Sequence, residues 1–193
     1  MGEGEPPNGF ERVRALDRNL FEWVAQRRAP GLDRTLPQLS LAASYSRLWM
    51  AIAALIAVFC QRRGRRAAAE GMIAIAVTSA VANMAVKPLV RRRRPGGSVP
   101  EERRLEQPDS TSFPSGHSAS AAAFAGAVGG QLRPMRIPLN TLAALVGFSR
   151  VYTGVHYPGD VVVGWLLGKA VAGIVHQVSL RLDGRSRSAS GAR

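Results

Sequence analysis

The sequence is poor in cysteine, lysine and acidic side chains. Its 193 residues include one cysteine, Cys60, which excludes a disulfide framework or a thiolate metal cluster within one chain. Lysine occurs only at Lys87 and Lys169, and 13 acidic residues face 26 basic ones, giving a net charge of +13. Arginine therefore carries nearly all of the positive charge, on a chain whose length suits a single domain.

Long stretches of the chain also lack charge, because the arginines gather in short runs such as 62–66 and 91–94. The hydrophobic share of 46% and the mean hydropathy of −0.02 exclude a disordered basic tail protein. A pI of about 11.5 suggests nucleic-acid binding, but that would require the arginines to share one soluble surface. We expect instead a polytopic membrane protein with no nucleic-acid partner.

Five apolar segments approach the roughly 20 residues that a membrane span requires. They cover residues 39–60, 67–86, 115–132, 138–155 and 160–180. The third is rich in alanine and glycine, which allow close packing, so we expect it in the interior. The predicted fold class is all-α, a polytopic membrane helix bundle of about five spans.

Residues 10–28 predict an amphipathic helix that carries too many charges to cross a bilayer. We expect it to lie in the membrane interface, the alternative being a soluble helix packed on a loop. Residues 1–9 are acidic and proline-rich, which predicts a disordered segment without a cleavable signal peptide. Residues 10–184 then form a single membrane domain, and residues 185–193 a disordered basic tail.

Alternating spans place the connections 61–66 and 133–137 on one side of the membrane and the segments 87–114 and 156–159 on the other. The unusual polar residues all fall on the second side, at predicted helix ends. They are Lys87, Arg94, Ser115, Gly116, His117, Arg150, His156 and Asp160.

Three fixed cations, a serine hydroxyl and the backbone N–H groups of a helix start suit a tetrahedral phosphate group. Two histidines beside it can divide the chemistry, since one attacks phosphorus and the other protonates the departing oxygen. Asp160 lies four residues after His156, a spacing that lets its carboxylate hold the far ring nitrogen. His117 is then left as the acid. Because Lys87, Arg94 and Arg150 neutralise the phosphate, we expect neither a cofactor nor a metal.

The segments KPLVRRRRP, PSGH and SRVYTGVHYPGD resemble the three signature motifs of the type 2 phosphatidic acid phosphatase superfamily. This superfamily includes class A acid phosphatases and vanadium haloperoxidases, and the motifs extend over somewhat more than a third of the chain. The resemblance implies a phosphohistidine mechanism with His156 as nucleophile, Asp160 as its partner and His117 as acid. It also implies phosphate binding by Lys87, Arg94, Ser115, Gly116 and Arg150.

Other conspicuous side chains have plainer interpretations. We expect His176 to be structural, and Lys169 to snorkel or pair with Glu70 rather than to guide substrate. Arg91 to Arg93 either mark the interface or bind anionic head groups. Four aromatic residues are read as interfacial anchors: Trp49, Trp165, Tyr152 and Tyr157.

The sequence thus predicts an integral membrane phosphatase acting on a lipid phosphate monoester or diphosphate in the lipid bilayer, with no obligatory protein partner. Phosphatidic acid, phosphatidylglycerol phosphate, polyprenyl diphosphates and polyprenyl-linked sugar phosphates all remain open as substrates. A vanadate-dependent haloperoxidase or a catalytically silent membrane protein is the alternative. Connections 61–66 and 133–137 carry only basic charges, which places them in the cytoplasm and the active site on the outer face of the cell membrane.

Overall fold

The structure is a computed structural model that describes residues 8–190, with side chains described through Asp183. This part of the chain is helical and contains no strand, which confirms the predicted all-α class. The α-helices are α1 (Gly9–Gln26), α2 (Pro30–Ala42), α3 (Arg47–Phe59), α4 (Gln61–Ala80), α5 (Lys87–Leu89), α6 (Gly116–Gln131), α7 (Arg136–Tyr152) and α8 (Pro158–Ser190). Three short 3₁₀ segments, η1 (Ser44–Ser46), η3 (Glu101–Arg103) and η4 (Arg133–Met135), and one π-helical segment, η2 (Val81–Val86), complete the order.

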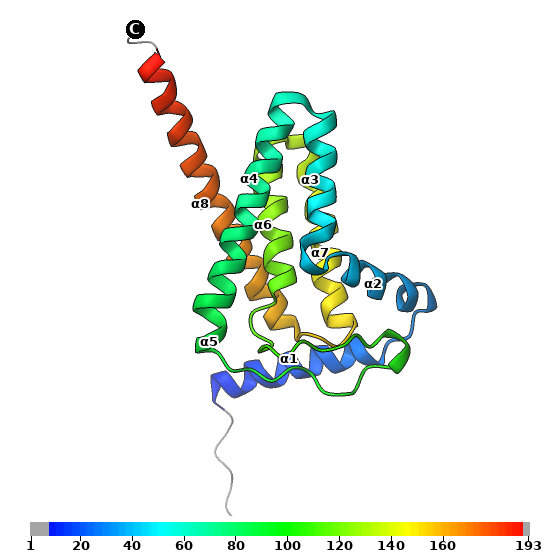
Figure 1. The fold of residues 1–193 in the computed structure, drawn as a ribbon. Coiled ribbons are helices and arrows are strands. Elements are labelled where there is room, and N and C mark those ends of the chain that lie inside the picture. The colour runs from blue at the N-terminus through cyan, green and yellow to red at the C-terminus, as the bar shows by residue number, and fades with distance from the viewer. Residues whose placement is uncertain (1–7, 191–193) are drawn as a thin grey trace, which may run out of the picture.

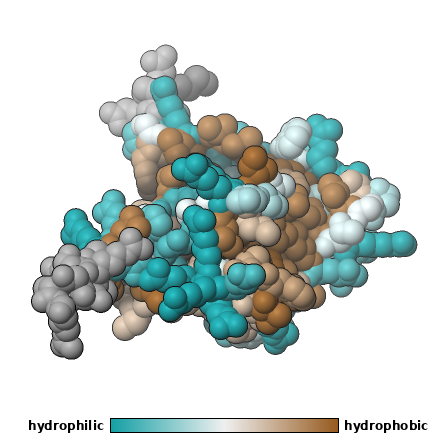
Figure 2. Space-filling model, turned by 90° about the horizontal axis from the view of Figure 1, so that it is seen from above, coloured by the Kyte–Doolittle hydropathy of each residue, from teal (hydrophilic) through white to brown (hydrophobic). Residues whose placement is uncertain are grey.

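The longer helices run roughly side by side, and α1 lies across one end of the bundle (Figure 1). The segment that follows α5 runs along the same end, whereas the α3–α4 junction and the C-terminal end of α8 lie at the other. Viewed from that other end, hydrophilic side chains project both at the rim and near the middle, with hydrophobic ones between them (Figure 2).

Helix α6 occupies the interior, as its small residues predict, and packs against α4, α7 and α8. Its contact with α8 depends on Gly164 and Gly168, which are four residues apart on α8. A Cβ atom at Gly164 would collide with the carbonyl oxygen of Ser115, and one at Gly168 with that of Ala119. Small residues at this spacing let two membrane helices approach closely.

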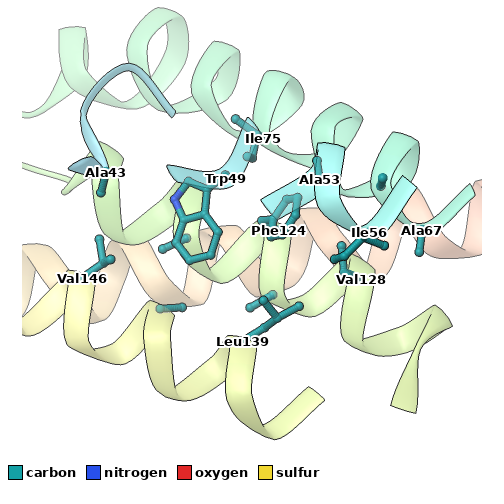
Figure 3. Packing of buried hydrophobic residues seen from close by; sticks show 14 residues of the cluster. Ala43, Trp49, Ala53, Ile56, Ala67, Ile75, Phe124, Val128, Leu139 and Val146 are labelled. Carbon is teal, nitrogen blue, oxygen red and sulfur yellow. The ribbon is translucent and has the colours of Figure 1, made fainter. Parts of the chain in front are cut away.

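The main hydrophobic core forms where α3, α4, α6 and α7 meet (Figure 3). Trp49 is only 1% exposed, and its ring centroid lies 5.3 Å from that of Phe124 on α6. The expectation that Trp49 is an interfacial anchor is therefore wrong, because α3 directs this side chain toward α6. Burial of two such rings contributes several kcal/mol, since each side chain removes a large apolar area from water.

The five expected spans are not confirmed. Within the described residues, two helical segments are long and apolar enough to cross a membrane, Gln61–Leu89 and Pro158–Asp183. A third is possible if α2 and α3, bent by 65° at their junction, together form one span. Helices α6 and α7, with 16 and 17 residues, fall short of the roughly 20 residues that a span requires.

Three predicted segments differ in the structure. Residues 61–66 are already helical, and the break from α3 lies at Cys60 and Gln61, where Gln61 has a φ of 51°. The segment 39–60 is interrupted at η1, where Tyr45 and Ser46 adopt left-handed backbone conformations. Helix α8 continues to Ser190, so residues 185–190 are helical where we expected a disordered tail. Expectations for residues 1–7 and 191–193 lie outside the described part.

Candidate active site

The expected site residues converge at the end of the bundle that α1 crosses, although they come from five separate parts of the chain. Lys87 begins α5, the last turn of the long helix that starts with α4, just after the π-helical segment η2. Arg94 follows in the connecting segment, and His117 stands in the first turn of α6. Arg150 lies in the last turn of α7, and His156 occupies the short turn before α8. The charges of Lys87, Arg94 and Arg150 all act on the ring of His117.

Ser110 connects the first two cations. Its hydroxyl oxygen lies 3.4 Å from Lys87 Nζ and 3.1 Å from Arg94 Nη2. The Arg94 guanidinium also donates to the backbone oxygens of Ser110 and Val155, at 3.1 and 3.0 Å. Arg94 thus joins the connecting segment to the turn that carries His156. Beside it, residues 87–88, 91–94 and 107–111 line a surface cleft of about 570 Å³.

The two ring nitrogens of His156 face different partners. Nε2 lies 3.3 Å from Arg94 Nη1, which can only donate, so Nε2 carries the lone pair. Nδ1 lies 3.5 Å from the Ser112 hydroxyl, which in turn donates to the Asp160 carboxylate. The direct distance from Nδ1 to Asp160 Oδ2 is 3.7 Å, too long for a hydrogen bond. Ser112 therefore relays the contact that the sequence predicts between His156 and Asp160.

Burial controls the protonation of His156. Its side chain is 3% exposed, and this burial lowers the pKa of the imidazole to about 4. The Asp160 carboxylate opposes the shift, while the charges of Arg150 and Arg94 add to it. Half-burial lowers the pKa of Arg94 as well, against the raising effect of Asp160. At neutral pH the ring of His156 is therefore neutral and its Nε2 lone pair is available.

Arg92 and Asp17 connect Asp160 to helix α1. Asp160 is fully buried and accepts from Arg92 Nη1 at 2.8 Å and from the Tyr157 backbone at 3.0 Å. Arg92 also pairs with Asp17 at 2.6 Å, and its guanidinium lies 4.1 Å from the Tyr157 ring centroid. Asp17 additionally accepts from the Gly159 N–H at 2.7 Å, at the start of α8. Such partners allow a buried carboxylate to stay charged.

The bend between α2 and α3 brings Ser40 and Ser44 close to two further side chains of the site, Arg150 and His117. Arg150 Nη1 donates to the Ser40 hydroxyl at 2.5 Å, and His117 Nε2 lies 3.3 Å from the Ser44 hydroxyl. Arg150 is 4% exposed, and its Nε has no hydrogen-bond partner among the described residues. A buried unpaired N–H is costly, so this donor is available to an anionic ligand.

The start of α6 supplies backbone donors. Ser115 caps the helix by accepting from the Ser118 N–H at 3.4 Å, and its own N–H donates to the Asp160 carbonyl at 3.0 Å. A Cβ atom at Gly116 would meet no atom within 4 Å, so the space beside this backbone is open to a ligand. A helix N-terminus of this kind favours phosphate oxygens.

Sequence reasoning missed several residues of the site: Asp17, Ser40, Ser44, Arg92, Ser110 and Ser112. Ser110 and Ser112 stand close before the second motif in the polar run DSTSFPSGH, which was the one available signal. Ser40 of α2, Ser44 of η1 and Asp17 of α1 lie far from the motifs in sequence. Nothing in the local pattern distinguishes them from ordinary helix residues.

Other polar expectations have mixed outcomes. Lys169 does not pair with Glu70, since its ammonium group contacts Asn140 and lies 5.3 Å from the Trp165 ring centroid. Glu70 instead contacts His176 Nδ1 at 2.8 Å and accepts from Gln131 at 2.6 Å. His176 thus joins α8 to α4, in keeping with a structural role.

Tyr152 is not an interfacial anchor. It is 2% exposed, donates to Asp33 at 2.5 Å and lies under the guanidinium of Arg103. Trp165 and Tyr157 are half-buried, with Trp165 against the main core and Tyr157 against Phe21. Among the residues with described side chains, no three histidine, cysteine or acidic groups gather as a metal site.

The fold and the site define a class of protein: a helical membrane protein with cations grouped around two histidines. Residues 67–183 match the sequence profile of the PAP2 superfamily, and the chain belongs to that superfamily. It is therefore a phosphoric ester hydrolase of the membrane lipid phosphatase type.

Relatives and solved structures support the same family. The chain is 36% identical over 160 residues to decaprenylphosphoryl-5-phosphoribose phosphatase of Mycobacterium tuberculosis, covering 82% of this chain and 85% of the relative. It is 33% identical over 176 residues to undecaprenyl-diphosphatase of Sulfolobus acidocaldarius, covering 88% and 82%. The crystal structure of Aquifex aeolicus LpxE matches with a TM-score of 0.70 and 26% identity, over 84% of this chain and 95% of that one. A transmembrane PAP2-type phosphatidylglycerolphosphate phosphatase from Bacillus subtilis matches with a TM-score of 0.70 and 25% identity, over 88% and 87%.

Proposed function

We propose that the protein hydrolyses a polyprenyl-linked phosphate, either a monoester or a diphosphate, through a phosphohistidine intermediate. The arrangement of His156 carries this proposal: a neutral buried ring whose Nε2 lone pair faces the cations and whose Nδ1 faces Ser112 and Asp160. The unpaired Nε of buried Arg150 supports an anionic ligand at the same place.

In the first step the substrate phosphate lies among Lys87, Arg94, Arg150 and the start of α6. His156 Nε2 attacks phosphorus, and the bond from phosphorus to the leaving oxygen breaks. The negative charge of the bound phosphate offsets the three cations that act on His117, so His117 is protonated in the complex. It gives this proton to the leaving oxygen, so the lipid alcohol or lipid monophosphate leaves in neutralised form. Fixed positive charge stabilises the equatorial oxygens in the transition state.

In the second step water attacks the phosphorus of phosphohistidine. His117, now neutral, takes a proton from this water, and the bond between Nε2 and phosphorus breaks. Inorganic phosphate leaves, and His156 returns to its neutral form. Ser112 and Asp160 hold the Nδ1 proton of His156 throughout, which stabilises the ring while it carries the phosphoryl group.

The polyprenyl substrate class rests on two relatives. The decaprenylphosphoryl-5-phosphoribose phosphatase and the undecaprenyl-diphosphatase each align with more than four-fifths of this chain, and both names specify a polyprenyl carrier. The phosphatidylglycerophosphatase B of Bacillus subtilis aligns with 51% of this chain, and the lipid A 1-phosphatases with 30%.

The experiment is phosphate release by the detergent-solubilised protein in the presence of EDTA. The substrates are a polyprenyl-linked sugar phosphate, a polyprenyl diphosphate, phosphatidic acid and phosphatidylglycerol phosphate. We expect release from the two polyprenyl substrates to exceed release from the two phospholipids, and vanadate to inhibit by occupying the phosphate site. No release from any substrate would favour a catalytically silent protein.

A matched pair of histidine variants tests the nucleophile. His156→Ala should abolish release, because it removes the ring whose Nε2 lone pair faces Arg94. His176→Ala removes a histidine that contacts Glu70 instead and should retain activity. If His156→Ala keeps wild-type turnover in a folded protein, the phosphohistidine mechanism is wrong.

A further inference from the structure

A small cleft rich in arginine lies between α1 and the segment that follows α5, two parts of the chain that run along the same end of the bundle (Figure 1). It has a volume of about 220 Å³ and is lined by Arg14, Arg18, Arg91, Arg92, Arg93 and Tyr157. Neither His117 nor His156 lines it. The cleft shares Arg91, Arg92 and Arg93 with the larger cleft beside Arg94, but neither Lys87 nor Arg94 lines it. A phosphate bound by Arg14 and Arg18 therefore lies beside the active site and not in it.

Positive charge in this cleft is only partly balanced. Arg92 pairs with both Asp17 and Asp160, so the carboxylates nearest to the cleft are already engaged. The other four arginines of the cleft form no ion pair with a described side chain. They are Arg14, Arg18, Arg91 and Arg93. Arg14 lies over the ring of Phe10 at 5.1 Å. An anion in the cleft would relieve the repulsion, and guanidinium groups suit phosphate oxygens well.

An apolar groove adjoins the cleft and shares Arg14, Arg91 and Arg92 with it. This groove has a volume of about 540 Å³ and is formed by apolar side chains of α1 and α8, including Phe10, Val13, Leu16, Val162 and Val163. Leu20, Pro158 and Val162 also line a second apolar groove of about 480 Å³, which contains Trp23 and Trp165. The two grooves are therefore continuous along the contact between α1 and α8.

We infer that the arginine cleft and the adjoining grooves form a binding site for an anionic phospholipid of the bilayer, separate from the active site. The lipid phosphate occupies the cleft, and its acyl chains follow the grooves. Charge complementarity selects an anion, and the apolar continuation selects an amphiphile rather than a soluble phosphate or a nucleic acid. The amphipathic pattern of α1 places these groups at head-group depth.

This lipid would join α1 to the rest of the molecule, because its head group contacts arginines from both α1 and the segment 91–93. It would also stabilise the position of Arg92, which reaches Asp160 directly. The inference does not depend on the proposed substrate or mechanism, since binding needs no hydrolysis.

The test uses full-length protein in phosphatidylcholine vesicles that contain a minor fraction of phosphatidylglycerol with brominated acyl chains. The phosphate of this lipid is a diester, and bromine quenches nearby tryptophan. Trp23 and Trp165 line the second groove, while buried Trp49 gives a constant background. We expect stronger quenching than with brominated phosphatidylcholine at the same fraction. A His156→Ala variant should show the same preference, which separates this test from the proposed catalysis.

The variant Arg14→Gln/Arg18→Gln should lower the preference for phosphatidylglycerol by about tenfold, because two basic groups leave the cleft. Arg14→Lys/Arg18→Lys keeps the charge and should keep most of the preference, which controls for folding. Arg62→Gln/Arg63→Gln removes the same charge from the start of α4, at the opposite end, and should have no effect. Equal quenching by both lipids in the wild type, or equal losses in the two glutamine variants, would overturn the inference.

Discussion

At the residue scale, the site depends on a histidine that burial keeps neutral. A depressed pKa means that the neutral, nucleophilic form of His156 persists as the pH falls from the usual 6.5 to about 4. The acid limb of kcat/KM, which reports the free enzyme, should therefore lie near pH 4. The pH profile is measured with two phosphate substrates whose own pKa values differ. A limb at the same pH for both substrates belongs to the enzyme. A shared limb near pH 6.5 would show that His156 is solvated in the free enzyme.

Ser44 offers a second test at this scale. Its hydroxyl contacts the ring that is proposed to protonate the leaving oxygen, at 3.3 Å. Ser44→Ala should reduce turnover of a polyprenyl phosphate by roughly fivefold, the value of one hydrogen bond of about 1 kcal/mol. Turnover of an aryl phosphate, whose leaving group needs little protonation, should change less.

Ser46→Ala is the matched control for this measurement. Ser46 lies two residues further along, and the structure gives its side chain no contact with the site. Equal losses for both substrates in Ser44→Ala would contradict a role for Ser44 in positioning His117.

At the element scale, the contact between α6 and α8 depends on backbone proximity. A Cβ atom at Gly168 would collide with Ala119, whereas one at Gly173 on the same helix meets nothing within 4 Å. Gly168→Ala should lower the free energy of unfolding by about 1–3 kcal/mol, the usual cost of overpacking. Gly173→Ala should be neutral or stabilising, since alanine favours helix. Thermal unfolding in detergent compares the two, and equal melting temperatures would mean that the helices are further apart than described.

Helix α1 contacts the site through the carboxylate of Asp17, which suggests a second test at the element scale. Asp17 pairs with Arg92 and accepts from the Gly159 N–H. Asp17→Asn should lower the free energy of unfolding by about 1–2 kcal/mol, because a charge-assisted hydrogen bond is lost. Glu22→Gln makes the same chemical change at an exposed position of α1 and should leave the melting temperature unchanged. Identical curves for Asp17→Asn and the wild type would show that α1 is not held there.

At the scale of the whole molecule, the charge of the connections predicts which side of the membrane the site faces. The basic connection around 61–66 lies at the opposite end from the site, so we expect the site on the outer face. In a Cys60→Ser background, Ser98→Cys should react with a membrane-impermeant maleimide on whole cells, and Arg63→Cys should not. Both side chains are exposed. Gly64 is unsuitable, since a Cβ atom there would collide with Cys60. The reverse labelling would place the site on the inner face.

The sequence predicts local features well where the pattern is strong. The alanine-rich segment 115–132 predicts an interior helix, and α6 is that helix. The sequence does not predict where the aromatic residues lie. Trp49 and Tyr152 are residue types common at membrane interfaces, but both lie on helix faces that point inward. Periodicity gives the helix but not the neighbour that covers a given face.

For this protein, the sequence by itself determined the all-helical class and the order of three motifs whose polar residues lie near helix ends. The motifs lie within one segment of the chain, and the types of their residues, cations and two histidines, indicate the phosphate chemistry. Only the tertiary structure decided that Ser112 stands between His156 and Asp160, and that Ser40, Ser44, Arg92 and Asp17 complete the site. These contacts join residues up to 110 positions apart, as for Ser40 and Arg150. The bend at η1 creates the contacts of Ser40 and Ser44, and the position of α1 across the bundle creates that of Asp17. Both arise from packing between distant helices.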